Sequence, residues 1–393
     1  MEKYDVVIVG AGPGGGQLAR DLSKKGYKVI VIEKAMELGE PIYSTAVTPA
    51  ETIHEFDLPK EIAGRWGNSV LLAGPTERLE IKFDRVVGYV LRFKELKQFL
   101  IKDAIKNGAE TMVGTKVTHP IIKGGRVIGV QFKGINGPGE IYGKIIVDAS
   151  GPSGVLASQL GLRKTKEKRL SVGVEFLMEN LDLESNGRRA EIYMGNSIIP
   201  SGYIWLAATK KDEARVGVGW ITDFLRKKSN YKTLPYYLHN FIKTNPQTNI
   251  GSIIEIHTGI IYPNGGIRKQ VRDGFLVIGE AACQTSPIAG EGIRACMWSG
   301  RFAAEVISEA LTKKDYSSKF LSKYEKKWKG YVRNRWKLGR ICQKLMANRS
   351  DKEIDKSIRI LRKVDKEVFL RFLRSDFSRK DLLKLFPKLI HLF

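Results

Sequence analysis

The stretch YDVVIVGAGPGG, residues 4–15, decides the fold of this chain. Its first part, Tyr4–Gly10, is an apolar and β-branched run that ends in glycine, which is typical of a buried parallel strand. The following segment, Gly14–Lys25, carries leucines at helical spacing, and Gly26 is a helix stop. A second apolar run, Lys28–Glu33, predicts another buried strand. The chain therefore begins with a β-α-β unit.

The glycines of this unit have the G-x-G-x-x-G spacing of a dinucleotide site. Gly10 permits a tight turn, Gly12 lets the backbone approach a pyrophosphate, and Gly15 allows the helix to pack closely on the strand. The phosphate charge would then lie at the positive end of the helix. Glu33 is placed to accept hydrogen bonds from ribose hydroxyls, and its charge argues against the 2′-phosphate of NADP. The candidate residues are Gly10, Gly12, Pro13, Gly14, Gly15, Glu33 and Lys34.

Two further stretches extend this site. IIVDASGPSG, residues 145–154, reads as a strand that ends in an acid and then glycine and serine. The pattern of residues 273–305 predicts a strand, an acid, a glycine-rich turn and a long helix; its sequence is DGFLVIGEAACQTSPIAGEGIRACMWSGRFAAE. Together with the first motif, they resemble the three fingerprints of the para-hydroxybenzoate hydroxylase-like flavoprotein superfamily. The resemblance implies that the dinucleotide is FAD.

The resemblance also implies cofactor contacts by position. Gly279 and Glu280 would meet the ribityl and pyrophosphate groups, although the superfamily usually has Asp at the position of Glu280. The turn around Gly292 would offer backbone N–H groups to the flavin pyrimidine, and the helix that follows would stabilise an anionic reduced flavin. Arg92 would lie beside the phosphates, and Val117 would present its backbone to adenine. The other implied contacts are Ser44, Thr45, Asp148, Gly151, Pro287, Ala289, Gly290 and Ile293.

The middle of the chain resembles one branch of this superfamily. SGYIWLAATKKDEARVGVGW, residues 201–220, is similar to the Tyr-x-Trp-x-Phe-Pro segment of archaeal geranylgeranyl reductases. It matches at Tyr203 and Trp205 and has Ala207–Ala208 in place of Phe-Pro. That family saturates isoprenoid double bonds of archaeal membrane lipids, which implies hydride transfer from reduced FAD to a polyprenyl lipid. The aromatic pair would line an apolar tunnel, with Tyr203 as a candidate proton donor. The alternative is plain sheet core, because residues i and i+2 share one face of a strand.

The loop ELGEPIYSTAVTP, residues 37–49, departs from that family's pattern. Many relatives carry a cysteine there, whereas this chain has Ile42, Tyr43, Ser44 and Thr45. Chemistry that requires the thiol is therefore absent, while the two hydroxyl residues can still hydrogen-bond the cofactor. The three cysteines lie elsewhere without metal-ligand spacing, so no metal site is expected. Cys283 is interpreted as a small buried structural residue.

The order of predicted elements indicates an α/β fold: a Rossmann-like FAD-binding domain, an inserted antiparallel β-sheet domain and a C-terminal helical region. Leu170–Trp220 alternates apolar and polar residues, as antiparallel strands do. Phe93–Asn107 and Tyr231–Lys243 are predicted helices, and Phe275–Gly279 is a third buried strand. We expect the FAD-binding domain at residues 1–165 with 265–310 returning to it, the substrate domain at 166–264, and the basic helical region at 311–393.

The net charge of +24 is unusual, and much of the basic excess lies in the last third. One interpretation is solvated Lys and Arg on helix faces. The other is attraction to a polyanion, where an anionic membrane suits a phospholipid substrate and nucleic acid has no matching motif. The sequence has neither a run of apolar residues that would span a membrane nor a signal-peptide pattern. The expected location is the cytoplasm, with peripheral contact to the inner face of the membrane.

Two other functions share the FAD motifs. One is an FAD-dependent monooxygenase or halogenase of the same superfamily, against which the chain has no Trp-x-Trp-x-Ile-Pro segment. The other is a non-catalytic flavoprotein that binds lipid. The electron donor is open between NADPH and ferredoxin, because the one dinucleotide fingerprint is used by FAD.

Overall fold

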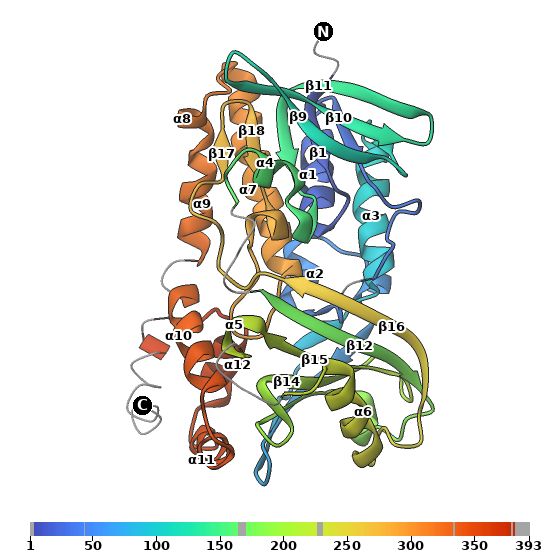
Figure 1. Cartoon of the computed structure of the whole chain (residues 1–393), viewed down its shortest axis with the longest axis vertical. Coiled ribbons are helices and arrows are strands. Elements are labelled where there is room, and N and C mark those ends of the chain that lie inside the picture. The colour runs from blue at the N-terminus through green and yellow to red at the C-terminus, as the bar shows by residue number, and fades with distance from the viewer. Residues whose placement is uncertain are drawn as a thin grey trace.

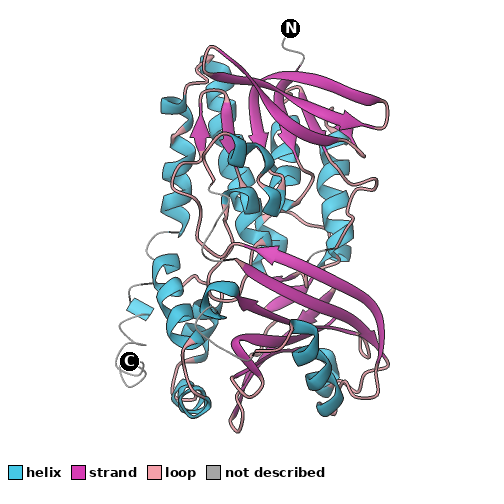
Figure 2. Ribbon diagram, in the orientation of Figure 1, coloured by secondary structure: helices cyan, strands magenta, loops and turns pink. Residues whose placement is uncertain are grey.

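The computed structural model contains two large sheets at opposite ends of an elongated molecule, with the C-terminal helices running along one side from the first sheet to the second (Figure 1). Figure 2 shows long helices packed below the first sheet and between the two sheets. Tyr43 of the predicted loop and residues 382–393 of the predicted basic region lie outside the part that the structure describes. The described residues are 4–42, 44–163, 170–225, 231–332, 335–378 and 380–381.

The first sheet has eight strands and contains the β-α-β unit. Its parallel part runs in the order β18-β11-β1-β2-β8, with β17 antiparallel at one edge and the β9–β10 hairpin joined to β11. The predicted α/β class and the three buried strands are confirmed. The strands are β1 (Tyr4–Val9), β2 (Val29–Ile32), β8 (Glu110–Met112), β9 (Lys116–Lys123), β10 (Arg126–Gly134), β11 (Gly137–Asp148), β17 (Val271–Arg272) and β18 (Phe275–Val277).

Three long helices cover one face of this sheet. Helix α1 (Pro13–Ser23) packs against both α3 (Phe93–Lys106) and α7 (Ile293–Lys313), and their apolar side chains bury the strand residues Val6 and Ile8. The opposite face is covered by β9, β10 and α4 (Val155–Gln159). Burial on both faces explains why these strands are continuous apolar runs.

The second sheet has seven strands in the order β16-β12-β15-β14-β13-β5-β6, all antiparallel except the β13–β5 pair. One face packs against α6 (Leu234–Thr244) through Phe176, Met178 and Leu206, and the other face lines a cavity. The strands are β5 (Ser69–Ala73), β6 (Arg78–Lys82), β12 (Ser171–Glu179), β13 (Arg189–Gly195), β14 (Ile199–Ala208), β15 (Ala214–Ile221) and β16 (Ser252–Ile261).

The division of the chain between the two sheets differs from the predicted one. Strands β5 and β6 come from within residues 1–165, yet they extend the second sheet through the parallel pairing of β5 with β13. The residue pattern of a hairpin is the same whichever sheet the hairpin joins. The sequence of β5–β6 therefore does not reveal that its partner strand is β13. A third, small sheet joins β3 (Val47–Pro49), β7 (Gly88–Val90) and β4 (Arg65–Gly67) beside the cavity.

The C-terminal region is helical, and several of its basic side chains pair with acids of the body. Arg359 and Arg362 contact Glu77 at 3.0 and 2.8 Å, and Arg374 contacts Glu51 at 2.8 Å. No helix among the described residues is long and apolar enough to cross a membrane. The remaining helices are α2 (Glu51–Glu55), α5 (Thr222–Leu225), α8 (Ser318–Leu321), α9 (Lys323–Val332), α10 (Arg335–Ala347), α11 (Asp351–Leu361) and α12 (Lys366–Leu373).

The glycines between β1 and α1 serve different purposes. Gly10 has φ +105°, in the region that favours glycine. A Cβ on Gly15 would overlap the carbonyl oxygen of Gly10, so its lack of a side chain lets α1 pack against the end of β1. A Cβ on Gly12 would meet nothing within 4 Å. The protein itself therefore tolerates a side chain at Gly12, and the open space above it suits a ligand that approaches the backbone.

This contrast predicts different outcomes for two alanine variants. Gly12→Ala should leave the thermal unfolding midpoint of the apoprotein unchanged and weaken FAD binding by about tenfold or more, because its methyl group would enter the ligand space. Gly15→Ala should lower the midpoint with or without FAD, because overpacking typically costs about 1–3 kcal/mol. Calorimetry of the apoprotein and a fluorescence titration with FAD measure both effects. Unchanged FAD affinity in Gly12→Ala would contradict the assignment.

Candidate functional site

The three sequence motifs meet at the carboxyl ends of the parallel strands. A Cβ on Gly10 would overlap the carbonyl of Ala149 in the second motif. A Cβ on Gly14 would lie 3.2 Å from the carbonyl oxygen of Cys296, so the first and third motifs also touch. Ligands of open α/β sheets bind at this end of the strands.

The residues at this junction fit the ADP half of FAD. The N-terminus of α1 is directed at the open space beside Gly12, and this helix has no side-chain cap and no acid in its first turn. Glu33 accepts hydrogen bonds from the backbone N–H groups of Ala11 at 2.8 Å and Ala35 at 2.9 Å, which orients its carboxylate beside the turn. Backbone N–H donors of α1 would hold the pyrophosphate, and Glu33 would receive the ribose.

The side chain of Asp148 is engaged by protein groups of the second motif. Its side chain is fully buried, and both oxygens are occupied by its own loop. Oδ1 accepts from the N–H and hydroxyl of Ser150 at 3.0 and 2.5 Å, and Oδ2 accepts from the N–H groups of Leu156 and Ala157 at 2.9 and 2.8 Å. Asp148 therefore shapes the second motif and caps the start of α4, and its contact with the cofactor stays a prediction.

Glu280 is also engaged by protein groups. Its carboxylate accepts hydrogen bonds from the backbone N–H of Tyr262 and the hydroxyl of Thr285. Burial raises the pKa of Glu280 to about 7, against the lowering effect of those bonds and of the nearby Arg163. The longer side chain that replaces the usual Asp thus fastens the third motif to the segment after β16, and a ribityl contact of its side chain remains a prediction.

The other implied residues lie around this junction. Arg92 is exposed at the start of α3, and Lys34 is exposed after β2. Val117 is buried in β9, two residues after Thr115, whose N–H bonds the carbonyl of Glu33 at 2.9 Å. A Cβ on Gly151 would meet nothing within 4 Å. Pro287, Ala289, Gly290, Gly292 and Ile293 form the turn into α7.

A large apolar cavity adjoins this turn. Its volume is about 590 Å³, within the roughly 300–1,000 Å³ of ligand pockets. Its walls are the open face of the second sheet, the loop that contains Ser44 and Thr45, the turn into α7 and apolar side chains of α10–α12. Tyr203 and Trp205 both line it, so the aromatic pair faces a cavity rather than the sheet core beneath α6.

Trp205 lies across glycines of the neighbouring strands. A Cβ on Gly217 of β15 would overlap its indole ring, and a Cβ on Gly219 or on Gly173 of β12 would touch the ring at 3.4 Å. Trp205 pairs with Gly217 in one row of the sheet, and Gly173 and Gly219 pair with each other in the next row, beside Tyr203. The glycines of VGVGW (residues 216–220) and SVGVEF (residues 171–176) therefore form the floor of the cavity against which the indole lies.

Glu175 stands at the end of that indole and joins four elements. Its carboxylate accepts from Trp205 Nε1 at 2.9 Å, from Arg215 Nη1 at 3.0 Å and from the hydroxyl of Thr45. His257 of β16 lies opposite, with Nδ1 at 3.6 Å. Burial works to raise the pKa of Glu175, but His257, Arg215 and the other donors outweigh it and hold the pKa below its ordinary value. Glu175 therefore stays ionised.

The sequence alone does not reveal this cluster. Glu175 and Arg215 occupy alternating positions in strands whose other residues are mostly apolar, and only the register of β12 with β15 and β16 brings the charges together. A signal was present: a carboxylate and a guanidinium at inward positions of a predicted sheet must be paired.

The turn into α7 contains an acidic residue, Glu291, that the sequence patterns did not single out. Glu291 lines the cavity between Gly290 and Gly292, and its carboxylate accepts from the N–H of Arg294 at 2.8 Å. Burial raises its pKa to about 7. Tyr203 lies at the same end, since its hydroxyl donates to the carbonyl of Ala289 at 3.2 Å, and burial raises its pKa to about 12. Glu291 is therefore much the stronger acid of the two.

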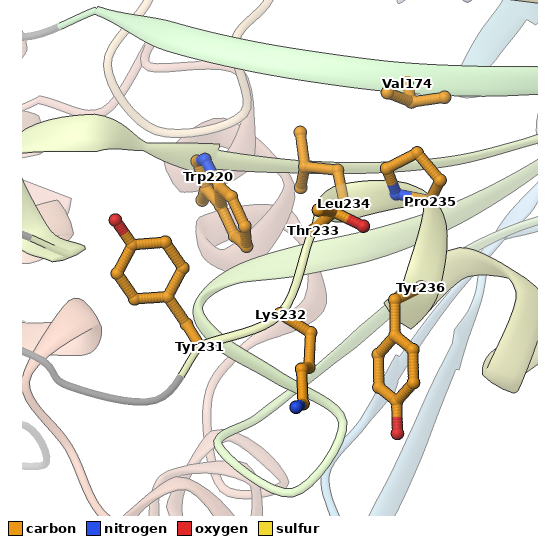
Figure 3. A pocket seen from close by; sticks show the side chains of 8 residues that line it. All are labelled: Val174, Trp220, Tyr231, Lys232, Thr233, Leu234, Pro235 and Tyr236. Carbon is orange, nitrogen blue, oxygen red and sulfur yellow. The ribbon is translucent and has the colours of Figure 1, made fainter.

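A second hollow lies beside α6. Figure 3 shows Val174 of β12 on one side and Trp220, Tyr231 and Tyr236 around the rest. Trp220 meets Tyr231 edge to face at 5.6 Å, and Tyr231 and Tyr236 are each about half exposed. No titratable carboxylate or histidine of the described chain lines this hollow. Nor do the described residues contain a cluster of His, Cys, Asp and Glu that could hold a metal ion.

Two family models match the chain in succession. An FAD dependent oxidoreductase model matches residues 5–169, and a geranylgeranyl reductase catalytic domain model matches residues 170–261. The junction of the two matches lies close to the predicted start of the substrate domain at residue 166. The second match contains β12–β16, which carry Glu175 and Trp205.

Several known proteins are similar over most of their length. The digeranylgeranylglycerophospholipid reductase of Haloferax volcanii is 32% identical, covering 93% of this chain and 91% of that protein. The reductase of the same name from Methanocaldococcus jannaschii is 31% identical, covering 98% of each. A geranylgeranyl bacteriochlorophyll reductase-like structure from Thermoplasma acidophilum has a TM-score of 0.88 with 27% identity over 100% of both chains.

Flavin-dependent halogenases share the fold alone. A triple mutant of a flavin-dependent brominase has a TM-score of 0.71 at 21% identity, covering 99% of this chain and 98% of that one. The nucleotide-binding junction, the glycine-floored aromatic cavity and the relatives that match nearly the whole chain point to a different branch. This chain belongs to the digeranylgeranylglycerophospholipid reductase family and is an FAD-dependent oxidoreductase.

Proposed function

We propose that this enzyme reduces the isoprenoid double bonds of geranylgeranyl chains in archaeal membrane lipids. The observation that carries the proposal is the cavity: it is lined mainly by apolar side chains and it reaches the turn into α7, where the family places the flavin. A polyprenyl chain is long, apolar and flexible, and it needs such a cavity rather than a small polar pocket.

The cavity provides the positioning and the exclusion of water that reduction of an unactivated alkene requires. When bound, FAD in its reduced form provides the hydride. The protein must hold the alkene close to the donor and keep water away. Tyr203 and Trp205 form one wall, with ring centroids 5.7 Å apart, and the glycines beneath Trp205 keep its indole flat against the sheet. Met346 and Leu373 of the C-terminal helices help to enclose the other side.

The second alkene carbon needs a proton, and we infer that Glu291 provides it. A carboxyl with a pKa of about 7 is protonated in a large fraction of molecules near neutral pH and releases its proton readily. The Tyr203 hydroxyl, with its pKa of about 12, holds its proton too firmly for this work. Tyr203 is then a wall of the cavity and a support of the Ala289 carbonyl.

The lipid must come from a membrane, and we propose peripheral contact rather than insertion. Basic side chains on the C-terminal helices that are not paired with acids would attract an anionic surface. Electrons would arrive from NADPH or from ferredoxin. The described residues contain a single Gly-rich dinucleotide turn, the one assigned to FAD.

The direct test is an anaerobic assay of the FAD-loaded protein, reduced with dithionite, on digeranylgeranylglycerol phosphate in neutral detergent. Mass spectrometry should show products heavier by the mass of two hydrogens for each double bond reduced. Oxidised enzyme serves as the control. No change in the lipid in this assay, together with insertion of oxygen into an aromatic compound when a parallel sample of reduced enzyme is exposed to air, would overturn the proposal.

The role of Glu291 predicts a pH dependence. Because only the protonated carboxyl can donate, lipid reduction by pre-reduced enzyme should be fastest below about pH 7 and fall as the pH rises through that value. Glu291→Gln should slow reduction by roughly 100-fold, in line with the loss of a general acid, and abolish the pH dependence. Stopped-flow flavin absorbance measures both.

The matched control is Tyr203→Phe, which removes a hydroxyl at the same end of the cavity. It should slow reduction by less than about tenfold and keep the pH profile, since general acid catalysis would survive. If Tyr203→Phe abolishes reduction while Glu291→Gln retains it, the proton donor is the tyrosine and the inference is wrong.

A further inference from the structure

Five arginines line the cavity, and two of them have no acidic partner among the described residues. Arg189 pairs with Glu191 at 2.9 Å, Arg349 pairs with Glu353 at 3.9 Å, and Arg374 pairs with Glu51 at 2.8 Å. Within the described chain, Arg65 of β4 and Arg188, which precedes β13, make no ion pair. The positive charge of the cavity is therefore concentrated at these two.

Both guanidinium groups are held in place by uncharged groups. The Arg188 guanidinium lies over the ring of Trp66, 3.8 Å from its centroid. Arg65 donates to the carbonyl of Asn186 and approaches the carbonyl of Gly187 at 3.5 Å. Burial, together with the charge of Arg188, lowers the pKa of Arg65, so the two positive charges are close enough to repel each other. Two fixed like charges with donors to spare are an arrangement that an anion would stabilise.

The pair lies at the far end of the cavity from the flavin-facing turn. Along β14, Tyr203 contacts Ala289, Trp205 follows, and Ala208 ends the strand. A Cβ on Gly187, the residue before Arg188, would lie 2.8 Å from the Cβ of Ala208. Five residue steps of a strand span roughly 17 Å. The small side chains of Ala207 and Ala208 line the cavity where the family usually has Phe-Pro, and the lining continues to the arginines.

We propose that Arg65 and Arg188 bind the phosphate of the lipid's polar head group, so that the isoprenoid chain extends from them along Trp205 toward the flavin. This inference rests on the proposed function, because it names the part of the substrate that fixes its position in the cavity. Guanidinium groups bind phosphate oxygens in bidentate fashion, and stacking on Trp66 restricts the position of the Arg188 guanidinium. The head group would thus set which double bonds reach Glu291.

Two probe lipids in the same neutral detergent test the site: digeranylgeranylglycerol phosphate and digeranylgeranylglycerol, which lacks the phosphate. The KM of wild-type enzyme should be about tenfold lower for the phosphate lipid, as expected for charge-assisted hydrogen bonds. Arg65→Gln and Arg188→Gln should each raise that KM about tenfold and leave kcat and the KM of the neutral lipid unchanged. Arg188→Lys should restore part of the affinity, because it keeps the charge and loses the bidentate geometry.

The matched control is Arg359→Gln, which removes an arginine of α11 that does not line the cavity and pairs with Glu77 at 3.0 Å. It should leave both KM values unchanged. FAD content and the thermal unfolding midpoint check that every variant is folded. Equal KM values for the two lipids in wild-type enzyme, or an equal effect of Arg359→Gln, would overturn the site.

Two further outcomes separate the source of the phosphate and the underlying function. Inorganic phosphate should compete only at concentrations far above the KM of the phosphate lipid, and competition at comparable concentrations would make free phosphate the ligand and overturn the head-group assignment. Lipid binding is followed independently by the quenching of tryptophan fluorescence. If neither lipid is reduced but the phosphate lipid still binds in an arginine-dependent manner, the proposed function fails and the site stands.

Discussion

The arrangement of the cavity depends on one buried carboxylate, that of Glu175. It holds the indole of Trp205, the guanidinium of Arg215 and the hydroxyl of Thr45, and it faces His257. These partners come from three strands of the second sheet and from the loop that follows the β-α-β unit. A buried charge costs several kcal/mol unless it is paired, so the second sheet must form in one register and this loop must close on it. The two parts of the chain are thereby joined at the cavity.

The glycines provide the space that the ligand site and the cavity need. In the nucleotide turn, Gly10 and Gly15 let a strand and a helix meet, and Gly12 leaves room for a ligand. In the second sheet, Gly173, Gly217 and Gly219 leave room for the ring of Trp205 instead. The same absence of a side chain thus makes both the phosphate site and the aromatic wall. The cavity extends from the carboxyl of Glu291 to Arg65 and Arg188 at the other end, which make no ion pair with any residue that the structure describes.

Much of the fold and of the cofactor site could be predicted from the sequence, because the patterns that indicate them are local. The β-α-β unit, the three motifs and the aromatic pair all follow from residues within a few positions of each other. A strand-ending acid such as Asp148 has the same pattern whether it bonds a cofactor or its own loop. Glu175 and the arginine pair were missed because their roles arise from register and from β5–β6 joining a distant strand. Glu291 lies within the third motif, but its raised pKa comes from burial in the folded chain, which the local pattern does not show.

The proposed reaction requires the isoprenoid chain to occupy the cavity between α7 and the glycine-floored sheet. A crystal structure of the protein with FAD and digeranylgeranylglycerol phosphate tests this most directly. We predict FAD extended from Gly12 to the turn at Gly292, and a lipid chain lying against Tyr203 and Trp205. A lipid chain in the hollow beside Tyr231, with the cavity filled by solvent, would contradict it.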